Sequence, residues 1–259
     1  MQRSIEEIRK QQLGLAAISY DSVETLRAFA DKHGITFPLL SDAGSKTIDA
    51  WGLRNRDATG RASGVPHPGT FVIDRGGRVV SRAFEAAYQE RETAASILTT
   101  IDAAAAGPPG SIEVAGRHLR ARLSLSNRTA APGHRVTLLA DVTPGPNIHV
   151  YAPGQQGYLP IALALAASPD FKAAAPRFPP SREYLFVPLN ERVQVFDRPF
   201  RILQDVTLAL TPSLRQRAVA KETVTIAGTL DYQACDDKVC FKPETMPLTW
   251  TIGLTPIVR

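Results

Sequence analysis

The chain has 259 residues, 44% of them hydrophobic and 21% charged, a composition typical of a folded globular protein and not of a disordered or fibrous one. At roughly 100 to 200 residues per domain, this length predicts two domains. The net charge of +5 comes from scattered lysines and arginines, which argues against nucleic-acid binding, and no apolar run approaches the roughly 18 residues of a membrane-spanning helix.

The N-terminal part of the chain begins with a charged amphipathic helix over residues 1–10, which lacks the apolar core of a secretory signal. The apolar run 13–19 predicts a buried parallel strand. Asp21 and Glu24 form a capping-box pattern for a following helix that Gly34 ends. The residues expected to be buried on this helix are Val23, Leu26, Phe29 and Ala30.

The next segments continue the alternation of strands and helices. They predict a strand over 37–40, a helix over 41–51, a hairpin over 69–78 and a closing helix over about 89–105. Such an order of elements indicates a layered α/β domain.

A domain boundary is predicted at Gly107-Pro108-Pro109-Gly110, which cannot continue a helix. Beyond it the patterning changes to short alternating runs separated by proline and glycine turns, which is typical of a β-sandwich. These runs cover residues 118–125, 135–142, 206–210 and 222–230. We therefore expect an α/β domain over residues 1–107 and an all-β domain over residues 111–259.

The two cysteines of the chain, Cys235 and Cys240, lie within six residues of each other. In one continuous strand, five steps of about 3.3 Å would put their Cα atoms about 16 Å apart, whereas a disulfide tolerates less than about 7 Å. A disulfide therefore requires a turn between them, and the residues 236–238 are suitable for one. As a structural bridge it would contribute only about 2 kcal/mol, because the loop is short.

Three interpretations of the pair follow from the residues: redox exchange, a purely structural bridge, or metal binding and inert thiols. Metal binding needs more ligands, and only the distant His149 and His118 are available. Aromatic residues near the pair could pack in a sandwich core or form a cap that shields the disulfide; they are Tyr232, Phe241, Tyr151 and Tyr158. Glu244 and Asp231 could relay protons or could be ordinary solvated carboxylates.

The segments 19–22, 29–34, 37–42 and 70–74, with Gly77-Arg78, resemble the middle of a peroxiredoxin of the bacterioferritin-comigratory type in the AhpC/TSA family. The resemblance covers about residues 1–100 and implies a thioredoxin-like fold. In that family a peroxidatic cysteine begins the helix that precedes Leu13, but this chain has no cysteine before Cys235. We therefore expect the first domain to be incomplete, through a truncated gene model, an internal start or a fragment, and a coding extension upstream of Met1 could supply the missing cysteine.

Pro68 immediately precedes the expected strand at Gly69. Thioredoxin-like proteins often have a cis proline at this point, next to the reactive thiol. The alternative interpretation is an ordinary trans turn proline, since X-Pro bonds are usually trans.

The segments 231–245 and 147–157 resemble the cysteine segment and the upstream strand and glycine loop of DsbD-type N-terminal domains. This resemblance covers about residues 111–256 and implies an immunoglobulin-like sandwich that carries electrons between periplasmic partners through its cysteine pair. Four residues separate the cysteines here, whereas the best-known member has five. The chain also lacks the membrane domain and the C-terminal thioredoxin domain of full-length members.

The leading functional hypothesis is thiol:disulfide exchange through Cys235 and Cys240, with thiol or disulfide proteins as partners and no cofactor or metal. One alternative is an antioxidant peroxidase whose catalytic cysteine lies upstream of Met1. Another is a non-enzymatic interaction module in which the bridge only holds a loop. The family resemblance favours the periplasm, and nothing in the sequence specifies an oligomeric state.

Overall fold

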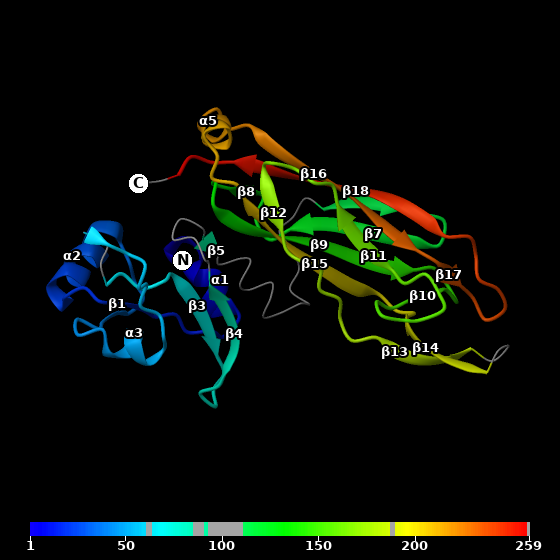
Figure 1. Ribbon diagram of the computed structural model, residues 1–259, viewed down its shortest axis with the longest axis horizontal. Coiled ribbons are helices and arrows are strands. Elements are labelled where there is room, and N and C mark those ends of the chain that lie inside the picture. The colour runs from blue at the N-terminus through cyan, green and yellow to red at the C-terminus, as the bar shows by residue number, and fades with distance from the viewer. Residues whose placement is uncertain (61–63, 85–90, 93–110, 187–189, 258–259) are drawn as a thin grey trace. The chain divides into compact units, whose positions relative to one another are not determined.

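The structure is a computed structural model that describes residues 1–60, 64–84, 91–92, 111–186 and 190–257 (Figure 1). The chain divides into two compact units, Met1–Ile101 and Asp102–Arg259. In the part of the chain that the structure describes, no helix is long and apolar enough to cross a membrane.

The first unit alternates short helices and short strands. β1 and β2 pair in parallel, and α2 connects them as a crossover helix. β3 and β4 form an antiparallel hairpin. The elements are η1 (Gln2–Ser4), α1 (Ile5–Lys10), β1 (Ala17–Ser19), α2 (Val23–His33), β2 (Leu39–Ser41), α3 (Lys46–Ala50), β3 (Gly69–Ile73), β4 (Val79–Phe84) and β5 (Arg91–Glu92). β1 and α3 are both shorter than the sequence pattern predicts, and the prediction that β1 is buried is wrong, since Ile18 is 44% exposed.

The N-terminus of α2 differs from the predicted capping box. Ser22 is the N-cap, because its side chain accepts a hydrogen bond from the Thr25 amide at 3.3 Å. Asp21 instead accepts a hydrogen bond from the Ser19 hydroxyl at 2.6 Å. Gly34 ends the helix as predicted, with a φ of 60° that favours glycine.

The apolar side of α2 is only partly covered. Leu26 is buried as expected, whereas Val23 is 56% exposed and Phe29 is 50% exposed. The prediction that these two side chains are buried is therefore wrong, whereas Ala30 is half-buried.

The predicted hairpin is confirmed, and Asp74 stabilises its turn. The Asp74 carboxylate accepts hydrogen bonds from the amides of Gly76 at 2.8 Å and Arg78 at 2.9 Å. Pro68 precedes β3, and no cis peptide bond occurs in the described residues, so the cis-proline alternative is wrong. The helix expected over 89–105 lies outside the described residues, except at Arg91–Glu92, where the structure has strand β5.

The second unit consists almost entirely of strands. They are β6 (Ile112–Ala115), β7 (Leu119–Leu125), β8 (Thr129–Ala130), β9 (His134–Pro144), β10 (His149–Tyr151), β11 (Ala162–Leu165), β12 (Phe171–Ala173), β13 (Arg182–Phe186), β14 (Glu191–Phe196), β15 (Phe200–Leu208), β16 (Thr223–Tyr232), β17 (Ala234–Cys235) and β18 (Glu244–Leu254). The helix α5 (Pro212–Val219) precedes β16. Each of the four alternating runs expected from the sequence overlaps a strand, namely β7, β9, β15 or β16.

Three sheets build this unit. One has the strand order β12–β15–β9–β7–β6, a second has the order β11–β16–β18–β8, and a small sheet has the order β13–β14–β10–β17. The buried residues of the first two sheets form one hydrophobic core, and the indole N–H of Trp250 on β18 donates a hydrogen bond to the Leu139 carbonyl on β9 at 3.3 Å. The unit is therefore a β-sandwich, as predicted.

We expect Ile226→Ala to lower the free energy of unfolding of the second unit by about 2–5 kcal/mol, because Ile226 on β16 is fully buried in this core. Ile112→Ala is the matched control, since Ile112 also lies on a strand but is 54% exposed. Urea unfolding followed by circular dichroism measures both values. Equal losses in the two variants would contradict the assignment of the core.

Candidate functional site

The small sheet has two different faces. Val150 on β10 and Ala234 on β17 are opposite each other and belong to the main core of the sandwich. Their neighbours Tyr151 and Cys235 belong to a separate buried cluster that also contains Val193 and Val195. Successive side chains of a strand point to opposite faces of its sheet, so the cysteine lies on the face away from the main core.

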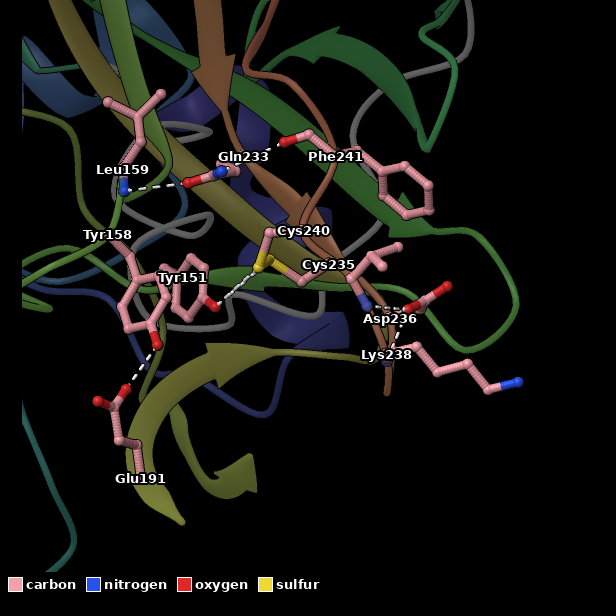
Figure 2. The surroundings of a disulfide bond; sticks show 11 residues. Tyr151, Tyr158, Leu159, Glu191, Gln233, Cys235, Asp236, Lys238, Cys240 and Phe241 are labelled. Carbon is pink, nitrogen blue, oxygen red and sulfur yellow. Dashed lines mark hydrogen bonds between the residues drawn. A yellow bond between two sulfur atoms is a disulfide. The ribbon is translucent and has the colours of Figure 1, made fainter. Parts of the chain in front are cut away.

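Cys235 and Cys240 form a disulfide, with their Cα atoms 4.0 Å apart. The turn expected between them is present, and Asp236 stabilises it. The Asp236 amide donates to the Val239 carbonyl at 3.0 Å, and its carboxylate accepts from the amides of Lys238 and Val239, both at 2.8 Å (Figure 2). These backbone hydrogen bonds hold the pKa of Asp236 below its usual value.

The two cysteines differ in exposure. Cys235 has 0% of its surface exposed, whereas Cys240 is an exposed residue at the start of the returning arm of the hairpin. The Phe241 amide continues this arm by donating to the Ala234 carbonyl at 2.8 Å. Cys240 is therefore the more exposed residue of the pair.

The Tyr151 side chain contacts both sulfur atoms. Its hydroxyl oxygen lies 3.3 Å from Cys235 Sγ and 3.4 Å from Cys240 Sγ (Figure 2). Since disulfide sulfurs have no hydrogen, the tyrosine hydroxyl is the donor. Burial raises the pKa of Tyr151, and the neighbouring Tyr158 and Glu191 raise it further, so the hydroxyl stays protonated near neutral pH.

Two more tyrosines surround Tyr151. The Tyr158 ring stacks on the Tyr151 ring at 4.1 Å, and its hydroxyl donates to Glu191 at 2.5 Å, which raises the pKa of Tyr158 (Figure 2). The Tyr184 hydroxyl on β13 donates to Asp237 at 2.7 Å, and this hydrogen bond raises the pKa of Tyr184. Tyr184 thus connects β13 to the turn between the cysteines.

Three of the residues predicted to support the pair lie elsewhere in the second unit. Tyr232 is fully buried in the main core, and the Phe241 ring stacks on His118 at 4.1 Å and points away from the sulfur atoms (Figure 2). Glu244 accepts a hydrogen bond from the Arg117 amide at 3.0 Å. Within the described residues none of the three forms a hydrogen bond with either sulfur. Tyr232 ends β16 in one of the two larger sheets, whereas Cys235 lies on β17 in the small sheet.

Pro68, the remaining predicted residue, belongs to the first unit.

Two residues near the disulfide were not identified from the sequence as part of its surroundings. Tyr184 lies far from the cysteines in the sequence, and only the pairing of β13 with β14 and of β14 with β10 brings it to the site. His149, considered only as a metal ligand, lies opposite Cys235 in the β10–β17 pair. Among the described residues no group of three or more potential ligands is arranged to hold a metal ion.

Two known protein families match the chain, one within each of its two compact units. Residues 1–82 match the sequence model of the AhpC/TSA family, and residues 122–249 match that of "Thiol:disulfide interchange protein DsbD, N-terminal". Both matches confirm the resemblances seen in the sequence.

Curated relatives match the N-terminal part of the chain. Chloroplastic peroxiredoxin Q of Sedum lineare is 38% identical over 76 residues, which cover 29% of this chain and 39% of that protein. The thiol-disulfide oxidoreductase ResA of Halalkalibacterium halodurans is 30% identical over 81 residues, which cover 31% of this chain and 40% of that protein. The chain thus spans well under half the length of these relatives.

Solved structures with some likeness to the chain include the N-terminal periplasmic domain of ScsB from Proteus mirabilis, with a TM-score of 0.35, 14% identity, and coverage of 57% of this chain and 51% of that one. Another is the reduced N-terminal domain of Neisseria meningitidis DsbD, with a TM-score of 0.30 and 14% identity. The match covers 46% of this chain and 82% of that chain. At such low TM-scores the fold assignment rests on the sheets described above and on the family match. The chain therefore joins a thioredoxin-like region that matches the AhpC/TSA family to an immunoglobulin-like domain that matches the N-terminal domain of thiol:disulfide interchange protein DsbD.

Proposed function

We propose that this protein exchanges thiols and disulfides with partner proteins through Cys235 and Cys240. The observation that carries the proposal is the disulfide on the face of the small sheet away from the main core, with one exposed and one buried cysteine. A bridge in this position can open and close while the sandwich core stays intact.

The exchange begins when a thiolate of the partner attacks Cys240 Sγ, which belongs to the exposed residue. A bond forms between the partner sulfur and Cys240 Sγ, and the bond between Cys240 and Cys235 breaks. The electron pair of the broken bond goes to Cys235 Sγ, which leaves as a thiolate. A second thiolate of the partner then attacks its own sulfur in the mixed disulfide and releases Cys240, so that the partner dithiol is oxidised and the cysteine pair is reduced. The reverse sequence reduces a partner disulfide.

Tyr151 supports the step in which Cys235 becomes a thiolate. Its hydroxyl is already within 3.3 Å of Cys235 Sγ, and a hydrogen bond to an ionised group is stronger than one to a neutral group. Because the raised pKa keeps this hydroxyl protonated, it can donate to the sulfur in both the disulfide and the thiolate state.

A purely structural role for the bridge agrees less well with its position. The loop that it closes is short, and the chain-entropy estimate for such a loop is about 2 kcal/mol. The large core of the sandwich contains neither cysteine. The domain therefore has a source of stability that does not depend on the disulfide.

The AhpC/TSA match over residues 1–82 favours peroxide reduction as a second candidate function. Reduction of a peroxide by this family's chemistry oxidises a thiolate to a sulfenic acid, and residues 1–82 contain no cysteine. Peroxidase activity would therefore need a thiol from outside this region, whereas the exchange reaction uses the two cysteines that are present.

We expect Cys235→Ser and Cys240→Ser each to abolish disulfide exchange while the sandwich stays folded. The Cys235→Ser variant should be the better trap for a mixed disulfide, because it keeps the exposed Cys240 and lacks the resolving sulfur. Thiol titration across a dithiothreitol series, non-reducing gel electrophoresis and thermal melting measure these properties. The proposed function is wrong if the wild-type disulfide resists reduction in the folded protein, or if either variant is unfolded at room temperature.

We expect Tyr151→Phe to slow exchange with dithiothreitol about tenfold or more, because a hydrogen bond to a charged group contributes about 1.5–3 kcal/mol and 1.4 kcal/mol corresponds to a factor of ten. Tyr158→Phe is the matched control and should have a much smaller effect, since the Tyr158 hydroxyl binds Glu191 and not a sulfur. Stopped-flow kinetics of reduction measure both rates. Similar rates in the two variants would exclude the role given to the Tyr151 hydroxyl.

A further inference from the structure

His149 is a buried polar side chain next to the disulfide. It is 2% exposed, and its Nε2 atom has no hydrogen-bond partner within the described residues. Most buried polar atoms have a partner, so an atom without one calls for an explanation.

The strand pairing places His149 beside Cys235. The two residues are directly opposite each other in the antiparallel β10–β17 pair, where side chains share a face and Cβ atoms are about 4.5–5.5 Å apart. Tyr151, two residues further along β10, shares this face. The imidazole ring is 5.7 Å from the Tyr151 ring and 4.6 Å from the Tyr184 ring. His149, Tyr151 and Cys235 therefore form one group on one face of the small sheet.

The titratable and charged groups around His149 come from each neighbouring element. They are Tyr151 on its own strand, Tyr184 on β13, Asp197 after β14 with its ion-pair partner Arg182, and Asp236 and Asp237 in the turn after β17. Burial lowers the pKa of His149, while the carboxylates of Asp237, Asp197 and Asp236 act in the opposite direction. With the disulfide closed, His149 is therefore neutral near neutral pH.

We propose that His149 becomes the imidazolium that balances the charge of the Cys235 thiolate when the disulfide is reduced. The inference rests on the proposed exchange function and adds the group that takes up a proton in it. Reduction transfers two electrons from the partner dithiol to the pair and is accompanied by two protons. One proton goes to the Cys240 sulfur, and the other goes to His149, which then faces the Cys235 thiolate.

The need for such a group follows from the burial of Cys235. A thiolate at a residue with 0% exposure loses its hydration, and an unpaired buried charge is strongly unfavourable. The Tyr151 hydroxyl can donate one hydrogen bond to this sulfur but remains neutral. The imidazole opposite Cys235 can carry the positive charge, and cysteine thiolates next to an imidazolium have a lowered pKa.

The test uses the full chain with Cys240→Ser, in which Cys235 is the single thiol, with and without His149→Gln. Thiolate absorbance at 240 nm is titrated from pH 5 to 9.5. We expect the Cys235 thiol to titrate below its ordinary pKa of about 8.5, and His149→Gln to raise the midpoint by at least about one unit, a tenfold loss of thiolate near neutral pH. His118→Gln is the matched control, since His118 stacks on Phe241 and should leave the midpoint unchanged. Equal midpoints with and without His149 would overturn the proposal.

A second measurement needs no variant at position 149 and so stands even if His149→Gln fails to fold. Proton NMR of the imidazole groups in the wild-type chain should show one histidine that is neutral at pH 7 in the oxidised protein and protonated after reduction. If no histidine changes its charge between the oxidised and the reduced protein, the proposal is contradicted. Exchange of the wild-type protein with dithiothreitol is measured separately. If exchange occurs but the protonation state of His149 does not change, this inference alone is refuted. If the disulfide cannot be reduced, the proposed function is refuted.

Discussion

The alternation of side chains along β10 and β17 is the constraint on which the rest of the site depends. Val150 and Ala234 point into the sandwich core, so their neighbours Tyr151 and Cys235 must point to the other face. A shift of one residue in this pairing would turn the cysteine into the main core and move two apolar core residues to the face of the tyrosines. The main core therefore fixes the register, and the register fixes the position of the disulfide.

In this arrangement, the residues that stabilise the domain are different from those that surround the disulfide. The core between the two larger sheets supplies the buried apolar surface, while the small sheet carries the disulfide and the tyrosines around it. Polar contacts at the small sheet are specific: Tyr151 donates to sulfur, Tyr158 to Glu191 and Tyr184 to Asp237. Each contact joins a different segment of the chain to the surroundings of the cysteine pair.

The two cysteines differ in exposure because of the turn between them. Asp236 binds the amides of Lys238 and Val239 and so bends the chain sharply after Cys235. Cys235 stays within the buried end of the sheet, and Cys240 returns on the exposed arm. Cys235 is opposite His149 in the strand pair, and the Tyr151 hydroxyl lies within hydrogen-bond distance of both sulfurs. The two sulfurs differ in their surroundings although they are joined in one bond.

The sequence by itself determined the two-part organisation, the change from α/β to β patterning, and the turn between Cys235 and Cys240. These features are local, because they depend on periodicity, on turn residues and on the short spacing of the cysteines. Only the tertiary structure decided which aromatic residues accompany the disulfide. Tyr232 and Phe241 are close to the cysteines in sequence but contact the main core, whereas Tyr151, Tyr184 and His149 reach the site through strand pairing. Such pairing joins segments far apart in the chain, and its register depends on how the whole sandwich buries its apolar faces.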